Sequence, residues 1–410
     1  MDKQYNSLIG ILNLYITISV LIAPILQPYV LAGKSISLLL MLSNSILLLI
    51  YKFPYIISTN RNEIKFLFFL LYALSIPVIV GTILNYNIEI GSSYRGILLF
   101  SFCLFLYPEF VDYERLKNIY RVFVYSAIIV FFAQELSFNL LGFRFSALIP
   151  FFQISYAEGT EEFMLYQMTQ SRSSSFFLEP AHCATYIFPY FAISLYEAKK
   201  KGKILSKENL FLLFFFILFK SGMGIVCSGF MFLLYLKNNI SRKGKLLIII
   251  FLILLLFIIL FDNTLYLFFK ENYLSRSKEL SYITENSSGM IRITRGFRVF
   301  GDMSLLGQLF GLSNGAIEDA VKHSSIAYLF GDNSYVNNVQ KLLIGYGVIG
   351  TSLFIVYAMQ CYKLGTTLTK LVIFSFFLIS LMSNNLFDSV MLLYFCVAIC
   401  KHDDYQNNNY

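Results

Sequence analysis

Apolar runs of about 20 residues, the length that crosses about 30 Å of hydrocarbon, recur along almost the whole chain. Polar or basic segments separate these runs, and few charged residues lie inside them. The pattern predicts membrane-spanning helices over residues 8–27, 34–51, 66–84, 94–108, 119–141, a run that begins at Phe176, 246–262, 340–359, 369–384 and 388–400. Residues 209–236 are interrupted at Lys220, Ser221 and Gly222, which predicts two short spans there. Together these segments give about twelve crossings.

Lysine and arginine gather between alternate spans, most densely at Lys199, Lys200, Lys201, Lys203 and Lys207. Basic loops of membrane proteins stay in the cytoplasm. This rule places both termini in the cytoplasm and the two larger polar loops, at about 142–175 and 263–337, outside. If 209–236 were instead one long helix, about eleven crossings would remain and the Lys199 and Lys237 clusters would face opposite sides. We therefore prefer the hairpin.

Composition excludes a soluble globular protein, since 57% of the 410 residues are hydrophobic and only 14% are charged. The net charge of +8 is accounted for by the cytoplasmic loops and requires no nucleic acid. The first apolar run is too long for a cleavable signal peptide. The expected fold is an all-α polytopic integral membrane protein, with residues 1–410 forming a single membrane domain.

Cysteine and histidine residues give no sign of a cross-linked or metal-binding protein. All six cysteines fall in predicted spans or at their cytoplasmic ends, so we expect no disulfide framework in the outer loops. His182, His323 and His402 are too scattered in the sequence to predict a metal site. We expect neither a metal nor a cofactor.

The most informative stretch is residues 170–186, QSRSSSFFLEPAHCATY, where an outer loop enters a span. Arg172 precedes the apolar run, and Glu179 and His182 lie in its first two turns, beside a helix-starting Pro180. Ionisable groups at membrane depth indicate function by default, because each one is costly to place there. The alternative is structural: Glu179 caps the helix, and Arg172 reaches the lipid head groups.

A second candidate lies in the long outer loop, where residues 288–301 read SGMIRITRGFRVFG. Arg292, Arg295 and Arg298 recur every third residue and would occupy roughly 120° of one side of a helix. Guanidinium groups in such a row suit phosphate, which each of them can bind through two parallel hydrogen bonds. Lys220, at the tip of the predicted hairpin, would add a further cation. The alternative is a solvated helix face or contact with lipid head groups.

A third candidate is the approach to the span at 340–359. Asp332, Asn333 and Tyr335 precede it, and Gly345, Gly347 and Gly350 lie inside it. The functional interpretation aims the carboxylate and amide at a sugar hydroxyl, whereas the structural interpretation is helix capping. The glycines predict close helix packing, as is usual in lipid.

In this order, these motifs resemble the O-antigen polymerase (Wzy) family. The resemblance rests on RSSSFFLEPAH at 172–182, and three further features resemble the wider polymerase and ligase superfamily. These are Lys220-Ser221-Gly222, the Ser-Gly-x-x-Arg that ends at Arg292, and Asn333-Ser334-Tyr335 followed by Gly347-Val348-Ile349-Gly350. One residue departs from the pattern, because many superfamily members carry histidine where this chain has Asp332.

The resemblance implies a glycosyltransferase of lipopolysaccharide biosynthesis in the bacterial inner membrane, with its active site facing the periplasm. It would move a growing glycan from undecaprenyl diphosphate onto the next lipid-linked repeat unit, with a flippase and a chain-length regulator as partners. Arg172 and Arg292 would stabilise the leaving diphosphate, and Arg295, Arg298, Lys220, His182, Asn333 and Tyr335 would bind substrate. Either Asp332 or Glu179 would act as base. We favour Asp332 for this role and expect Glu179 to hold Arg172.

Two alternatives remain open from the sequence. An O-antigen ligase uses the same donor with a lipid A core as acceptor, and Asp332 in place of histidine argues against it. A lipid-linked oligosaccharide flippase has a similar length but is expected to show two related halves and short outer loops. Here the polar residues are concentrated in two unequal loops.

Overall fold

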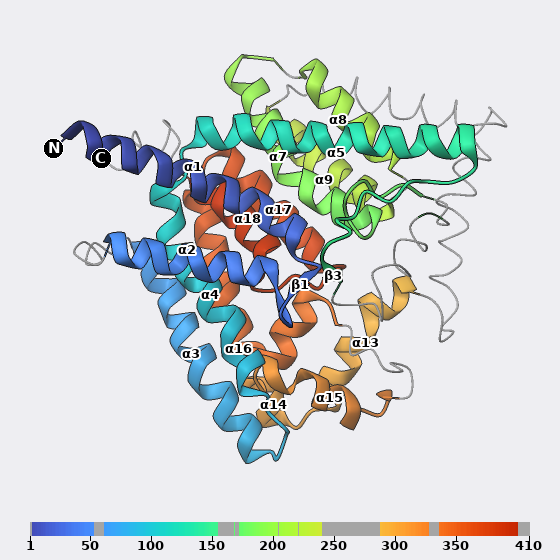
Figure 1. The fold of residues 1–410 in the computed structure, drawn as a ribbon. Coiled ribbons are helices and arrows are strands. Elements are labelled where there is room, and N and C mark those ends of the chain that lie inside the picture. The colour runs from blue at the N-terminus through green and yellow to red at the C-terminus, as the bar shows by residue number, and fades with distance from the viewer. Residues whose placement is uncertain are drawn as a thin grey trace.

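The computed structural model describes residues 2–52, 61–154, 168, 172–203, 205–219, 221–239, 288–327 and 336–400. Within these residues the chain is mostly helical, as the sequence predicts (Figure 1). Three described helices are long and apolar enough to cross a membrane, namely Lys65–Ile83, Tyr113–Leu141 and Asn338–Leu364. Shorter apolar helices accompany them at Gly10–Leu26, Ile36–Leu49, Ser93–Phe105, Gly222–Lys237, Thr367–Ser380 and Ser389–Ile399.

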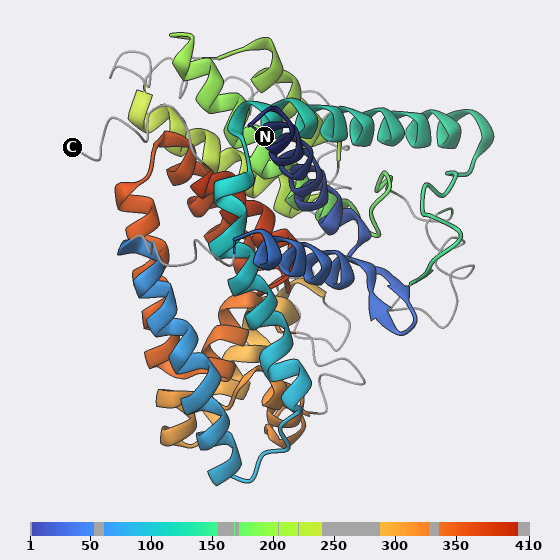
Figure 2. The ribbon, with the colours of Figure 1, turned by 60° about the vertical axis from the view of Figure 1, so that its left-hand side comes forward.

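The first half of the chain contributes most of the long helices. Its elements are α1 (Asp2–Leu26), β1 (Tyr29–Leu31), β2 (Lys34–Ser35), α2 (Ile36–Lys52), α3 (Arg61–Ile83), α4 (Ile90–Phe110), α5 (Tyr113–Leu141) and β3 (Gln153–Ile154). In both ribbon views α5 lies across the top of the molecule, and α3 and α4 descend below it (Figures 1 and 2).

The second half returns along these helices and adds a group of short ones at the bottom of the ribbon views. Its elements are α7 (Pro180–Lys200), α8 (Lys207–Leu218), α9 (Gly222–Asn239), α13 (Ser288–Asp302), α14 (Leu305–Phe310), the 3-10 helix η2 (Asn314–Ala316), α15 (Ile317–His323), α16 (Asn338–Leu364), α17 (Thr367–Ser380) and α18 (Ser389–Ile399). The most extensive packing is between α16 and α3.

Three details refine the sequence predictions. The expected interruption of residues 209–236 is confirmed, because α8 ends at Leu218 and α9 begins at Gly222. The span expected from Phe176 begins later, at Pro180, whose missing N–H suits the first helical position. A small antiparallel sheet of order β2-β1-β3 departs from the all-α prediction. It forms because β1 and β3, in separate connecting segments, satisfy one another's backbone groups. The predicted span at 246–262 lies outside the described residues.

Aromatic side chains fill the interior between α3, α4, α16 and α18. Phe66 packs on Phe100 with ring centroids 6.0 Å apart, and Phe100 packs on Phe387 at 5.5 Å. Phe354 on α16 adds its ring to Phe69 at 5.4 Å. All five rings are buried, and their tilted arrangements are those that aromatic pairs favour.

The helix α16 is broken at Gly347, where φ is +64°. A break leaves backbone carbonyls without their usual helical partners. Two carbonyls before the break accept hydrogen bonds from another segment: Ile344 O from Leu312 N at 3.0 Å, and Gly345 O from Ser313 N at 2.8 Å. The segment after α14 therefore docks into the break of α16.

Glycine is required on both sides of this contact. A Cβ atom on Gly347 would lie 2.4 Å from Leu309 O, and one on Gly311 would lie 2.5 Å from Gly345 O. Gly350 is equally confined, because a Cβ atom there would lie 2.6 Å from the Tyr72 ring. The expectation that the small residues of this span permit close packing is thus confirmed.

A second, smaller hydrophobic core combines residues of α13, η2, α15 and α16 with residues of the segments that connect them. It contains Val299, Met303, Leu312, Ala316, Ile317, Ala320, Val321, Ile326, Val336 and Ile344, with Leu84, Tyr86 and Ile88 packed against it. The loop after α3 is hydrogen-bonded to this group, since Asn87 N donates to Asp319 Oδ2 at 2.9 Å. Burial raises the pKa of Tyr86, and the Asp319 carboxylate adds to the rise.

Replacing Gly347 by alanine should destabilise the protein by roughly 2–4 kcal/mol, because the side chain meets both an unfavourable φ and a close backbone oxygen. Thermal unfolding in detergent would measure the loss. Gly229→Ala in α9 is the matched control, since nothing lies within 4 Å of the place that its Cβ atom would take. Alanine should there be neutral or stabilising by up to about 1 kcal/mol. Equal effects of the two substitutions would contradict the proposed constraint.

Candidate functional site

Gln134 of α5 is hydrogen-bonded to both ends of the loop between α5 and α7. Its Oε1 accepts a hydrogen bond from Ser175 N at 2.9 Å, and its Nε2 donates to Ser175 O at 3.2 Å and to Phe145 O at 3.1 Å. Gln134 and Ser175 are both buried. One amide therefore satisfies both backbone groups of Ser175, whose φ of +58° is uncommon for a residue other than glycine.

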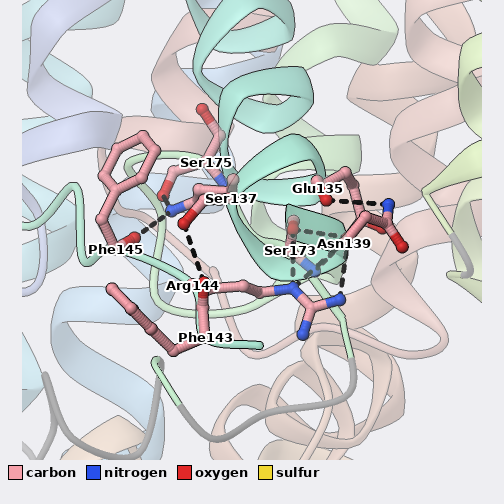
Figure 3. A network of polar contacts seen from close by, with 9 residues as sticks. Glu135, Ser137, Asn139, Phe143, Arg144, Phe145, Ser173 and Ser175 are labelled. Atoms are coloured by element: carbon pink, nitrogen blue, oxygen red, sulfur yellow. Dashed lines mark hydrogen bonds and ion pairs between the residues drawn. The ribbon is translucent and has the colours of Figure 1, made fainter. Parts of the chain in front are cut away.

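The neighbouring Glu135 also holds the loop, because it forms an ion pair with the buried Arg144 (Figure 3). Arg144 is 2% exposed; its Nη2 lies 3.1 Å from Glu135 Oε1 and its Nε donates to Ser173 Oγ at 2.9 Å. Its guanidinium also lies over the Phe138 ring, 3.7 Å from the centroid. A buried charge requires such partners, because removing one leaves the other unpaired and poorly solvated. The loop is therefore closed at its base by Glu135, Arg144 and Ser173.

A second contact fixes the same loop to the end of α1. Tyr29, Leu148, Ile154 and Leu178 form one buried cluster, with Leu26 and Ile36 packed against it. The Tyr29 hydroxyl accepts a hydrogen bond from Ile149 N at 3.0 Å. Burial raises the pKa of Tyr29, and that hydrogen bond opposes the rise. Leu178 thereby ties the start of α7 to the end of α1.

These contacts position the residues that the sequence singles out at 172–182. Arg172 is half-buried and directly precedes the anchored Ser173, and Glu179 is half-buried at the N-cap of α7. His182 is exposed in the first turn of α7. Glu179 thus occupies the N-cap position, although its side chain makes no capping hydrogen bond.

The expected pairing of Glu179 with Arg172 is also not found among the ion pairs of these described residues. The glutamate that holds an arginine here is Glu135, and its partner is Arg144. Ser173 and Ser175, which lie between Arg172 and Glu179 in the sequence, are hydrogen-bonded to Glu135 and Gln134 of α5.

The arginines of α13 do not form one uniform row. Arg295 is 8% exposed, whereas Arg298 is exposed. The intervening Gly296 packs on α16, since a Cβ atom there would lie 2.5 Å from Gln340 Cδ. The helix therefore turns Arg295 towards the protein and Arg298 towards solvent. Arg292 lies in α13, and its side chain is outside the described residues.

The start of α16 is fixed by two asparagines that the sequence analysis does not select. Asn337 caps the helix, accepting from Gln340 N at 2.9 Å while its own N–H donates to Gln340 Oε1 at 3.0 Å. Asn338 N donates to Ser383 O at 2.8 Å, and Asn338 Oδ1 accepts from Asn385 N at 2.6 Å. The cap is thus Asn337, which corrects the capping interpretation of Asp332 and Asn333. Asp332, Asn333, Tyr335 and Lys220 lie outside the described residues.

Two further ionisable residues lie close to this point. Lys341 stands in the first turns of α16, and Asp388 caps α18 by accepting from Val390 N at 2.9 Å and Met391 N at 3.1 Å. Asp388 Oδ2 also accepts from Gln27 Nε2 at the end of α1, at 2.7 Å. A charged residue within a predicted apolar span is a sequence signal that marks both positions.

The starts of α7, α16 and α18 and the end of α1 therefore meet in one region. Leu178 joins α7 to α1, Gln27 joins α1 to α18, and Asn338 joins α16 to the segment before α18. Helix starts carry partial positive charge. Cations can stabilise a leaving anion, and carboxylates can accept a proton from a hydroxyl group. The region has both kinds of side chain.

Substitution of Glu135 by alanine should destabilise the protein by about 3 kcal/mol, because it leaves the Arg144 charge buried without its partner. Limited proteolysis should then cut within 142–175, and thermal unfolding would give the loss. Glu318→Ala is the control: it removes an exposed pair with Lys322, whose side chains are 65% and 67% exposed. Loss of that pair should change stability by less than about 1 kcal/mol. An equal loss of stability in the Glu135→Ala and Glu318→Ala variants would contradict the role of Glu135 in holding Arg144.

Comparisons with models of protein families, with curated proteins and with solved structures gave no match. The resemblance to the polymerase family therefore rests on the sequence motifs alone.

Proposed function

We propose that this chain is a polysaccharide polymerase of the O-antigen type. It transfers a growing glycan from undecaprenyl diphosphate onto the next lipid-linked repeat unit, at the outer face of a bacterial inner membrane. The proposal includes about twelve crossings with both termini in the cytoplasm. The observation that carries it is the meeting of the starts of α7, α16 and α18, which brings carboxylate and cationic side chains together on the side assigned to the outside.

Contacts between segments assigned to the cytoplasm support this arrangement. The Lys117 ammonium, near the start of α5, lies 3.4 Å from Glu197 Oε2 near the end of α7. The Lys199 ammonium, at the end of α7, donates to Thr367 Oγ1 at the start of α17, at 2.7 Å. The positive-inside rule assigns all of these segment ends to the same side.

Contacts between segments assigned to the outside form a second, separate group. β1 pairs with β3, and Asn87 N donates to Asp319 in the α13–α15 region. Gln27 donates to Asp388, which places the end of α1 beside the start of α18. The candidate residues Arg172 and Glu179 belong to this outer group. An alternation derived from charge alone is thus consistent with the contacts between distant segments.

The chemistry needs a cation for the leaving group and a base for the nucleophile. The anomeric C–O bond to the diphosphate breaks as a hydroxyl oxygen of the acceptor sugar bonds to the anomeric carbon. The diphosphate leaves with the electron pair, and Arg172, Arg292 and Arg295 stabilise its charge. Asp332 or Glu179 takes the hydroxyl proton. Of these two, Glu179 is the one that the structure describes, and it forms no ion pair with Arg172. No metal or nucleotide is required.

The binding set comprises Arg298, Lys220, His182, Asn333 and Tyr335. Exposure of Arg298 and His182 suits contact with a substrate that arrives from outside. A flippase would supply the lipid-linked unit, and a chain-length regulator would limit the product.

Labelling of single cysteines at positions 161 and 318 in intact cells tests the topology. Both sites should react with a membrane-impermeant maleimide added from outside, because both loops face the periplasm in the proposal. A cysteine at position 201 in the basic cluster should react only after permeabilisation. Protection of position 161 or 318 in cells with a permeable outer membrane would refute this arrangement.

Arg172→Ala and Arg292→Ala should each lower polymerisation by about a hundredfold or more, as expected when a group that stabilises the leaving charge is lost. Lysine should restore little activity, since it lacks the paired contact. Gel analysis of surface glycans would show single repeat units, while immunoblots show normal protein in the membrane. Lys322→Ala is the control, at an exposed ion pair. Long chains from the alanine variants would exclude these arginines, and complete loss of surface glycan would favour a ligase.

A further inference from the structure

Lys341 faces the segment that leads into α18. It lies three residues after Asn338, so the two side chains share one face of α16. Asn338 is held to this segment through Ser383 and Asn385. Lys341 and Asp388 each lie three residues beyond the contact of Asn338 with Asn385, on the two facing segments. The electrostatic interaction between their charges agrees with this placement.

Asp388 is held in a fixed position. Its Oδ1 accepts two backbone hydrogen bonds at the start of α18, and its Oδ2 accepts one from Gln27. Gln27 is itself held by Ser389, whose hydroxyl lies 3.2 Å from Gln27 Oε1. These contacts leave Asp388 able to accept a further hydrogen bond, since a carboxylate has about four lone-pair directions.

Lys341 is not directly paired with this carboxylate. No ion pair within 4.0 Å and no hydrogen bond of its ammonium occurs among the described residues, although Lys341 and Asp388 are both only half-buried. Nearby in the sequence, Asn384 has a buried Oδ1 atom without a hydrogen-bond partner. The segment from Asn384 to Asp388 and the facing turn of α16 thus contain both an unused donor and unused acceptors.

The charges of this pair select the ligand. When ionised, Asp388 repels an anion, and the Lys341 ammonium repels a cation. A hydroxyl group satisfies both residues, since it accepts from an ammonium and donates to a carboxylate. We propose that Lys341 and Asp388 form a binding site for the hydroxyl groups of a neutral sugar, separate from the arginines that contact diphosphate.

Within the proposed function, on which this inference rests, the sugar is part of the lipid-linked repeat unit. The site lies in the outer group of segments, where such a unit would arrive. It recognises the saccharide and makes no contact with the phosphate groups. Lys341 and Asp388 are therefore binding residues, and the proton of the reacting hydroxyl goes to the base already described.

The test compares two lipids that differ only in the sugar. Purified protein in nanodiscs is titrated with the lipid-linked repeat unit extracted from a strain lacking this protein, and with undecaprenyl diphosphate. Native mass spectrometry measures both affinities. Lys341→Met and Asp388→Asn should each weaken binding of the repeat unit about tenfold or more, the effect of one hydrogen bond to a charged group. Binding of undecaprenyl diphosphate should stay within about twofold, because no phosphate contact is lost.

Matched variants separate binding from folding. Lys370→Met removes a half-buried lysine from the corresponding turn of α17 and should leave both affinities unchanged. Lys341→Arg keeps a charged donor and should retain most of the binding. Thermal unfolding of each variant identifies those that misfold, and Asp388→Asn keeps an oxygen for the α18 cap.

Each outcome decides between the possibilities. Unchanged binding of the repeat unit by correctly folded Lys341→Met and Asp388→Asn would overturn the site while leaving the polymerase proposal intact. Equal loss for both lipids would identify Lys341 as a phosphate contact and also overturn it. If the wild-type protein bound neither lipid, the proposed function would itself fail, and this inference with it.

Discussion

The loop between α5 and α7 depends on one buried charge, the guanidinium of Arg144. It is almost fully enclosed, and its stability there requires Glu135, Ser173 and the ring of Phe138. The cost of leaving such a charge unpaired keeps the loop between α5 and α7 closed at its base. Two further contacts, of Ser175 with Gln134 and of Leu178 with Tyr29, fix the segment that contains Arg172 and leads into α7. A structural ion pair thus sets the position of functional candidates that make no ion pair with one another.

In the second half of the chain, the break in α16 fixes another segment in place. Gly347 frees two carbonyls that the segment at 312–313 satisfies, so the small core of α13–α15 is fixed to α16. Asn337 and Asn338 fix the opposite end of the same helical segment to the residues before α18. Lys341 lies on the short stretch of α16 between these anchors. Backbone hydrogen bonding, which no membrane segment can leave unsatisfied, therefore determines where the charged side chains stand.

Local signals in the sequence predict several helix boundaries but do not predict the arrangement of the site. Pro180 marks the start of α7, and the interruption near Gly222 separates α8 from α9, because both act on the backbone of their own segment. The sequence pattern places the cap of α16 too early, at Asp332 and Asn333, since several asparagines precede that helix and only Asn337 completes a capping box. Gln27 and Asp388 are 361 residues apart, and their contact follows from helix packing that no local pattern encodes. The three arginines of α13 share a side by spacing, yet packing of Gly296 on α16 separates Arg295 from Arg298.

The proposed polymerase faces a recognition problem that arginines alone do not solve. Its donor and its acceptor both carry a lipid diphosphate, so a cationic surface binds either one and cannot tell a sugar-bearing lipid from a spent carrier. Discrimination requires contacts that only the saccharide satisfies, because a site built for hydroxyl groups is left with unpaired charges when they are missing. A lysine and an aspartate held apart have this property: their charges cancel at a distance and offer little to phosphate. Asp388 is held by Gln27 and the start of α18, and among the described residues it forms no ion pair with Lys341. Retention of a sugar-bearing lipid over the released carrier would then follow from the same hydrogen bonds that join the helix ends.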